Sequence, residues 1–217
     1  MEFYHALNRG VEGRKLFLDD RDRFRFVHDL WEFNDSAPAP EFSRYRDLRN
    51  PDTLPARERI VDIHGWCLMS NHYHLLLSEC REGGLSYFLR KLNVGYANYF
   101  NERYERQGSL FQGRTKKILI ASDAHFLHIL HYIHLNPLDF LRATRDWRAG
   151  RIVGRGRAIE HLQKYRWSSY LDYCSRKNFP SVVTTELFVD VFKNYEKVIR
   201  SYLQDMEFDD VRPLLLE

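Results

Sequence analysis

The sequence predicts an α+β fold: a ferredoxin-like antiparallel sheet with helices on one face, followed by a C-terminal helical extension. The chain has 217 residues, a length that suits one domain with appendages, and 44% of them are hydrophobic, which is enough for a core. Strand-like and helical segments alternate in the order strand, helix, strand, strand, helix, strand, helix. Two neighbouring strand-like runs on either side of Ser70-Asn71 indicate a hairpin.

The first elements follow from short aromatic and apolar patterns. Residues 3–8 are aromatic-rich and run into Arg9-Gly10, which is typical of a strand that enters a turn. Residues 15–18 are a candidate for a second short strand. Asp19 or Asp20 then begins a helix, because apolar residues recur behind it at helical spacing. The proline-rich stretch 34–57 is predicted to be a loop insertion.

The central elements are the best defined. Residues 60–69 and 72–78 form the two arms of the hairpin, and Gly83-Gly84 separates them from a helix over 85–99. A strand is predicted at 118–120. Ser122 or Asp123 caps the next helix, which Pro137 ends.

The remainder of the chain is predicted to be an extension. We place a first domain at residues 1–145 and an extension that packs on it at 146–217. Residues 148–157 read as a flexible basic loop, and residues 188–203 as a final amphipathic helix.

Charge and cysteine content limit the classes of function. The net charge of +3 is small, but positive charge is concentrated in the middle of the chain. Residues 81–117 hold eight Lys or Arg against three acidic residues, and residues 141–166 hold eight against two. From Glu186 onward the balance reverses, with eight acidic residues against four basic, so we expect one anionic partner and one solvated end.

Other features set the expected compartment. The three cysteines are widely spaced and lack a CxxC pair, which argues against a disulfide framework or a cysteine zinc site. We expect no membrane span and no signal peptide, and therefore a cytoplasmic protein.

A histidine pair opens the second arm of the hairpin. Side chains alternate along a strand, so His72 and His74 point to one face and Tyr73 to the other. Two imidazoles placed in this way can bind one divalent cation. The alternative is two surface histidines beside an apolar strand, and this pair of residues does not by itself exclude it.

The helix that ends before Pro137 supplies a second group of polar residues. Apolar residues cover one of its sides, whereas His125, His128, Tyr132 and Asn136 form a stripe on the other. Tyr132 and Asn136 are one turn apart and can address the same point in space. A buried tyrosine followed by a capping asparagine remains the structural alternative.

Together these segments resemble a known family. The runs Met69-Ser70-Asn71-His72-Tyr73-His74-Leu75-Leu76 and Tyr132-Ile133-His134-Leu135-Asn136-Pro137 are similar to motifs of the REP-associated tyrosine transposases, which belong to the single-tyrosine HUH class. Weaker matches lie at residues 4–10, 108–114 and 167–170, so the resemblance covers residues 3–173. It implies that residues 1–145 are a catalytic domain that cleaves and rejoins single-stranded DNA.

The resemblance also implies roles for individual residues. His72 and His74 would bind a divalent metal, Mg²⁺ or Mn²⁺, with Asn136 as the third ligand. Tyr132 would be the nucleophile that forms a 5′-phosphotyrosine, so no nucleotide cofactor is expected. The partner would be single-stranded or hairpin DNA, with the enzyme acting as a monomer or a homodimer. Basic residues expected to contact phosphates are Arg9, Arg114, Lys116, Lys117, Arg151, Arg155 and Arg157.

Three alternatives stay open at this point. The chain could be a non-catalytic or domesticated DNA- or RNA-binding protein of the same fold. It could be a metal-dependent hydrolase in which water attacks in place of Tyr132. It could also belong to another HUH branch, such as replication initiators or plasmid relaxases, although the run at residues 132–137 favours the transposase branch.

Overall fold

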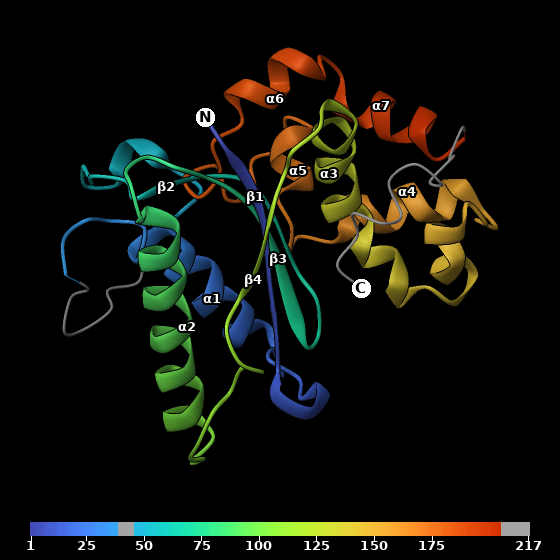
Figure 1. The fold of residues 1–217 in the computed structure, drawn as a ribbon. Coiled ribbons are helices and arrows are strands. Elements are labelled where there is room, and N and C mark those ends of the chain that lie inside the picture. Colours follow the sequence, from blue (N-terminus) through green and yellow to red (C-terminus); the bar gives the residue numbers. More distant parts are fainter. Residues whose placement is uncertain (39–45, 205–217) are drawn as a thin grey trace.

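The sheet has the predicted ferredoxin-like order. The computed structural model describes residues 1–38 and 46–204. Its four antiparallel strands run in the order β2-β3-β1-β4 (Figure 1). Their bounds are Phe3–Arg9 for β1, Val61–Leu68 for β2, His72–Glu79 for β3 and Lys116–Leu119 for β4. The predicted α+β class is therefore confirmed.

Two helices pack on one face of this sheet. They are α1 (Asp20–Glu32) and α2 (Gly84–Arg103), and they contact each other (Figure 1). The Asp19 side chain accepts a hydrogen bond from the Asp22 N–H and so caps α1 as predicted. Ala6, Leu75 and Leu77 project from the strands into the core beneath these helices.

The other face of the sheet is covered as well, so the helices are not confined to one face as predicted. Helix α3 (Asp123–Leu135) lies on it, and the extension packs over α3. Leu76 of β3 and Leu130 of α3 belong to this second core, together with Tyr170 and Phe188 of the extension. The helices of the extension are α4 (Arg155–Lys164), α5 (Tyr170–Tyr173), α6 (Glu186–Val191) and α7 (Tyr195–Tyr202).

Short 3₁₀ helices connect several of these elements. Two of them follow α3 directly and lead into the extension, at Asn136–Phe140 and Arg142–Ala149. The others are at Val11–Gly13 and Pro51–Thr53.

Some boundaries differ from the prediction. Residues 15–18 form no strand. The predicted basic loop at 148–157 is partly helical, because α4 starts at Arg155. The predicted final helix consists of two helices, α6 and α7. The Asn194 side chain accepts a hydrogen bond from the Lys197 N–H and so caps the start of α7. Of the predicted insertion at 34–57, residues 39–45 lie outside the described part, as do residues 205–217 of the acidic end.

The extension is joined to the edge of the sheet through main-chain hydrogen bonds. Leu68 N–H donates to the Trp167 carbonyl at 2.9 Å, and Ser169 N–H donates to the Trp66 carbonyl at 3.0 Å. Further along, Thr184 N–H donates to the Ile63 carbonyl at 2.8 Å. The outer side of β2 is therefore covered by the extension.

Within the described residues, no helix has the length and apolar character needed to cross a membrane.

Candidate functional site

The histidine pair lies on the face of β3 that meets α3. The imidazole rings of His72 and His74 are 4.9 Å apart and nearly perpendicular, as expected for alternate residues of one strand. Tyr73 points to the opposite face, where its hydroxyl donates to Asn93 at 2.8 Å. Burial raises the pKa of Tyr73 to about 12, so this tyrosine is poorly suited to act as a nucleophile.

A third histidine joins this pair from the neighbouring strand. β1 pairs with β3 so that His5 is opposite Leu76 and Leu7 is opposite His74. His5 Nε2 lies 3.0 Å from His74 Nδ1, and the two rings are stacked with an angle of 21° between them. Both side chains are fully buried. No role is predicted for His5 from the sequence alone.

Tyr132 lies beside these histidines. Its ring is 5.8 Å from the ring of His74 and 5.9 Å from that of His5, and it meets both edge-on. The side chain is 1% exposed and also contacts Trp147 at 5.7 Å. The structure thus brings the predicted nucleophile next to the predicted metal-binding pair, although separate elements carry them.

Both the nitrogen and the oxygen of the Asn136 side-chain amide form hydrogen bonds. Its Nδ2 donates to the main-chain carbonyl of Tyr132 at 2.9 Å, and its Oδ1 accepts from Arg148 Nη2 at 2.6 Å. Arg148 also donates from Nη1 to Asp139 at 2.6 Å. Its guanidinium carbon lies 5.6 Å from the centre of the Tyr132 ring. No role is predicted for Arg148 from the sequence alone.

The donors at this site suit a divalent cation in part. Neutral imidazoles are good ligands for manganese and zinc, and amide oxygens suit Mg²⁺ and Mn²⁺. His72 and His74 therefore fit. Asn136 Oδ1 retains a second lone pair, but the positive charge of Arg148 lies on the same oxygen and would repel a cation there. Asn136 fits as a ligand only if Arg148 moves.

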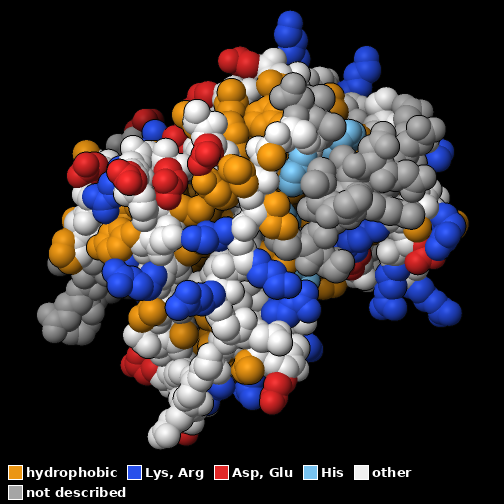
Figure 2. Space-filling view, viewed as in Figure 1, with side chains coloured by type: hydrophobic (Ala, Val, Ile, Leu, Met, Phe, Trp, Pro, Cys, Tyr) orange, Lys and Arg blue, Asp and Glu red, His pale blue; other side chains and the backbone are white. Residues whose placement is uncertain are grey.

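Three of the predicted phosphate contacts line one cavity at the end of β1. Arg9, Arg114 and Lys116 surround a space of about 230 Å³, together with Leu7, Asn8 and Gln112. Arg9 is the strand partner of His72, which places this cavity at the end of the sheet that carries the histidine pair. Figure 2 shows Lys and Arg side chains gathered on this side of the molecule, over β4 and the adjoining part of α2.

The other four basic candidates lie elsewhere. Lys117 points to the opposite face of the sheet, where its Nζ donates to Ser86 of α2 at 2.8 Å. Arg151 is exposed and lies 3.7 Å from Asp146. Arg155 and Arg157 are exposed in the first turn of α4. The structure does not bring these residues to the cavity.

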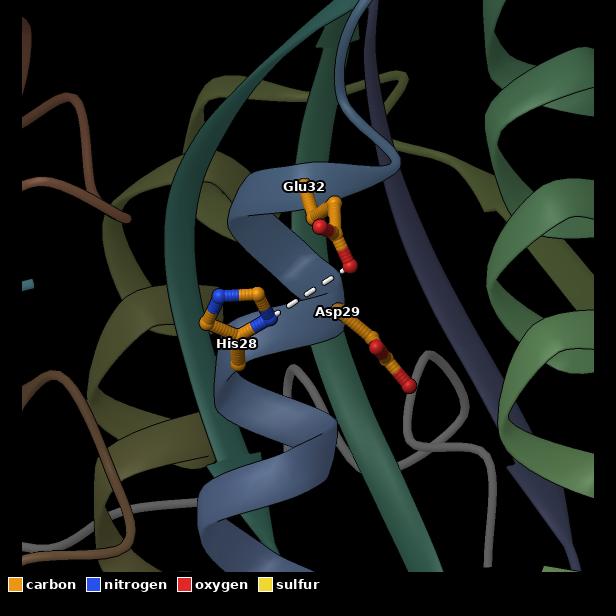
Figure 3. Close-up of side chains that lie close together, drawn as sticks. All are labelled: His28, Asp29 and Glu32. Atoms are coloured by element: carbon orange, nitrogen blue, oxygen red, sulfur yellow. Dashed lines mark ion pairs between the residues drawn. The ribbon is translucent and has the colours of Figure 1, made fainter. Parts of the chain in front are cut away.

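A second group of potential metal ligands lies in α1 (Figure 3). His28 Nδ1 and Glu32 Oε2 are 3.5 Å apart, and both side chains are buried. The Asp29 carboxylate points away from this pair and lies 2.8 Å from Arg25 Nε. Burial raises the pKa of Asp29 to about 8, despite the opposing effect of Arg25. We interpret the group as a buried polar cluster of α1.

Comparisons with known proteins add little to this picture. No protein-family model matches the chain, and no curated protein matches it. A solved structure of a REP-associated tyrosine transposase bound to a REP hairpin is similar to it, with 84% of each chain covered. The sequence identity is 11% and the TM-score is 0.49. Values this low do not establish family or function, and the fold is assigned from the chain's own strand order.

Proposed function

We propose that this protein cleaves and rejoins single-stranded DNA through a covalent 5′-phosphotyrosine on Tyr132. The observation that carries the proposal is the position of the Tyr132 ring, 5.8 Å from the ring of His74. A tyrosine, a histidine pair and an amide side chain within one helical turn of that tyrosine are the groups that such a reaction needs.

The reaction begins with attack by the Tyr132 hydroxyl oxygen on a phosphorus atom of the DNA strand. The bond from tyrosine oxygen to phosphorus forms, the bond from phosphorus to the 3′ oxygen breaks, and the leaving oxygen takes up a proton to become a 3′-hydroxyl. A bound Mg²⁺ or Mn²⁺ on His72 and His74 would neutralise phosphate charge and orient the phosphorus. The reverse step with a different 3′-hydroxyl joins new ends without a nucleotide cofactor.

The substrate is proposed to be single-stranded or hairpin DNA. Arg9, Arg114 and Lys116 give the cavity beside His72 a positive charge that suits phosphates of a strand entering the site. Arg155 and Arg157 would contact a more distant part of the same DNA.

Access to Tyr132 is part of the proposal. The side chain is 1% exposed and lies under Trp147 and Arg148, which belong to the 3₁₀ helix Arg142–Ala149. A phosphate reaches the hydroxyl only after this cover shifts. We therefore propose that DNA binding displaces the 3₁₀ helix before cleavage.

A cleavage assay tests the proposal. Hairpin DNA labelled at either end is incubated with the protein, with and without Mn²⁺, next to the Tyr132→Phe variant. We expect a metal-dependent, protease-sensitive adduct on the fragment 3′ of the cut, which Tyr132→Phe lacks. Tyr173→Phe is a control, because Tyr173 is also buried but lies in the extension. Cleavage that persists in Tyr132→Phe would instead indicate a hydrolase.

The burial of Tyr132 also favours a second candidate, a non-catalytic DNA-binding protein of the same fold. Such a protein would bind hairpin DNA through the same basic cavity but leave no adduct. Binding by wild type and by Tyr132→Phe with equal affinity, and no adduct across several hairpins and metals, would support this second function.

A further inference from the structure

We propose that His5 is a positioning residue that fixes which nitrogen of His74 faces the metal. The inference rests on the proposed function, since it assumes that His74 is a metal ligand. In this arrangement His74 Nδ1–H donates to His5 Nε2, and His74 Nε2 carries the lone pair that binds the cation.

The geometry of this contact is set by the sheet. His5 and His74 lie on adjacent antiparallel strands, and His5 is opposite Leu76, two residues along β3 from His74, so the two rings are diagonal neighbours on one face of the sheet. Their nitrogens are 3.0 Å apart, which is hydrogen-bonding distance, and both rings are fully buried. The contact is therefore a fixed part of the site.

The direction of the hydrogen bond decides what His74 can do. A neutral imidazole carries one proton, on either Nδ1 or Nε2. If His5 donated to His74 Nδ1, the proton of His74 would sit on Nε2 and block metal binding there. If His74 donates, its Nε2 carries no proton and has a lone pair that can bind a cation. Histidines that bind metals commonly donate their other N–H to a fixed acceptor in this way.

His5 also touches the nucleophile. The Tyr132 ring meets the rings of His5 and His74 edge-on at nearly equal distances of 5.9 and 5.8 Å. One side chain on β1 thus orients the metal ligand on β3 and limits where Tyr132 of α3 can lie. Its loss should affect metal binding and the position of Tyr132 together.

Another buried histidine of the sheet provides a comparison. His64 on β2 lies 2.8 Å from the hydroxyl of Ser78, which can donate or accept, so that contact imposes no tautomer. His64 is as deeply buried as His5 but does not contact His74 in this way. The His64→Phe variant is therefore a matched control for the loss of a buried imidazole.

The first test is a direct observation of the tautomer. Long-range ¹H–¹⁵N NMR of the histidine rings in the metal-free wild type, with His74 assigned from a His74→Gln spectrum, shows where its proton lies. We expect the Nδ1–H form for His74. A predominant Nε2–H form would overturn the inference, whatever the protein does to DNA.

The second test measures Mn²⁺ binding by titration calorimetry. We expect His5→Phe to bind Mn²⁺ about 10- to 100-fold more weakly, the usual effect of losing such a partner. His5→Gln, whose amide oxygen can still accept from His74, should stay within about threefold of wild type, and so should His64→Phe. If His5→Phe does not fold, loss of affinity in His5→Gln equal to that of His74→Gln would count against the inference.

The controls separate this inference from the proposed function. Wild type that binds Mn²⁺, with affinity lost in His72→Ala but kept in His5→Phe, would overturn the role of His5 alone. Wild type that binds no Mn²⁺, or binds it equally well without His72 and His74, would overturn both.

Discussion

Arg148 Nη2 donates to the amide oxygen of Asn136 at 2.6 Å, so an arginine of the extension lies on the atom expected to be the third metal ligand. The same guanidinium is 5.6 Å from the centre of the Tyr132 ring. Two cationic groups cannot share the amide oxygen without repulsion. The Arg148 hydrogen bond and a metal on Asn136 therefore exclude each other.

This relationship predicts that Arg148→Met binds Mn²⁺ more tightly than wild type, by a factor on the order of 5, because a competing donor and a like charge are removed. Adduct formation should speed up as well, since Arg148 belongs to the 3₁₀ helix that covers Tyr132 and must shift before cleavage. Calorimetry and the cleavage assay measure the two effects. Arg151→Met, also in the extension but exposed, should change neither.

The ligand role of Asn136 has its own test. If Asn136 is the third ligand, Asn136→Ala should weaken Mn²⁺ binding by about tenfold or more, as is found when a group that supports a metal site is removed. Unchanged Mn²⁺ affinity in a folded variant would restrict Asn136 to holding Arg148 and the end of α3.

The basic cavity predicts a salt-dependent loss of DNA affinity. Replacing Arg9, Arg114 and Lys116 together by Gln should weaken hairpin binding and reduce the slope of log affinity against log salt by about 1 for each lost phosphate contact. Fluorescence anisotropy at several salt concentrations measures this slope. Lys117→Gln is the matched control, because Lys117 belongs to the same strand but points to α2. An equal effect in Lys117→Gln would place the DNA elsewhere.

The buried His131 predicts acid sensitivity. Burial lowers the pKa of His131 to about 3, and the charge of His128 is a smaller cause in the same direction. The unfolded chain takes up a proton near pH 6.5 and the folded chain does not, so stability is full above that pH and falls as the pH decreases toward 3. The loss is up to about 1.4 kcal/mol per pH unit for this group.

Urea unfolding at about pH 7 and about pH 5 measures this loss. We expect His131→Phe to show a smaller decrease in the free energy of unfolding than wild type. Tyr195→Phe removes the hydroxyl 3.1 Å from His131 Nδ1 but leaves the imidazole buried, so it should remain acid-sensitive. An identical decrease in His131→Phe would show that other groups dominate.

Removal of the extension should prevent folding of the rest. A fragment of residues 1–145 would lose the side chains that cover α3, among them Tyr170, Phe188 and Tyr195, and the main-chain partners of β2. We expect no cooperative thermal transition by circular dichroism and strong binding of a hydrophobic dye. A fragment that melts cooperatively would establish residues 1–145 as an independent domain.

Much of the fold could be predicted from local patterns. The alternation in residues 60–78 predicted the hairpin, and Asp19 and Ser122 predicted the starts of α1 and α3 through side-chain caps that the structure contains. The histidine pair could be placed on one face because alternation in a strand is strict. These features depend on neighbours in the sequence.

The missed features depend on contacts between distant segments. The residues His125, His128 and Tyr132 suggested a polar stripe, but nothing in the sequence showed that the extension packs over α3 and buries much of that side. His5 was passed over because the register of β1 against β3 cannot be read from either strand alone. Arg148 stood in a run of basic residues typical of a solvated loop, and nothing local indicated its bonds to Asn136 and Asp139.

The two edge strands of the sheet, β2 and β4, differ in what covers them. The outer edge of β2 forms main-chain hydrogen bonds with Trp167, Ser169 and Thr184, whereas β4 is a strand of four residues in which Lys116 and Lys117 are both exposed. A second copy that approached along β4 would bring positive charges against positive charges. The edge strand β4 is therefore a poor template for pairing with a strand of another molecule. Concentrated protein should resist the formation of fibres through this edge.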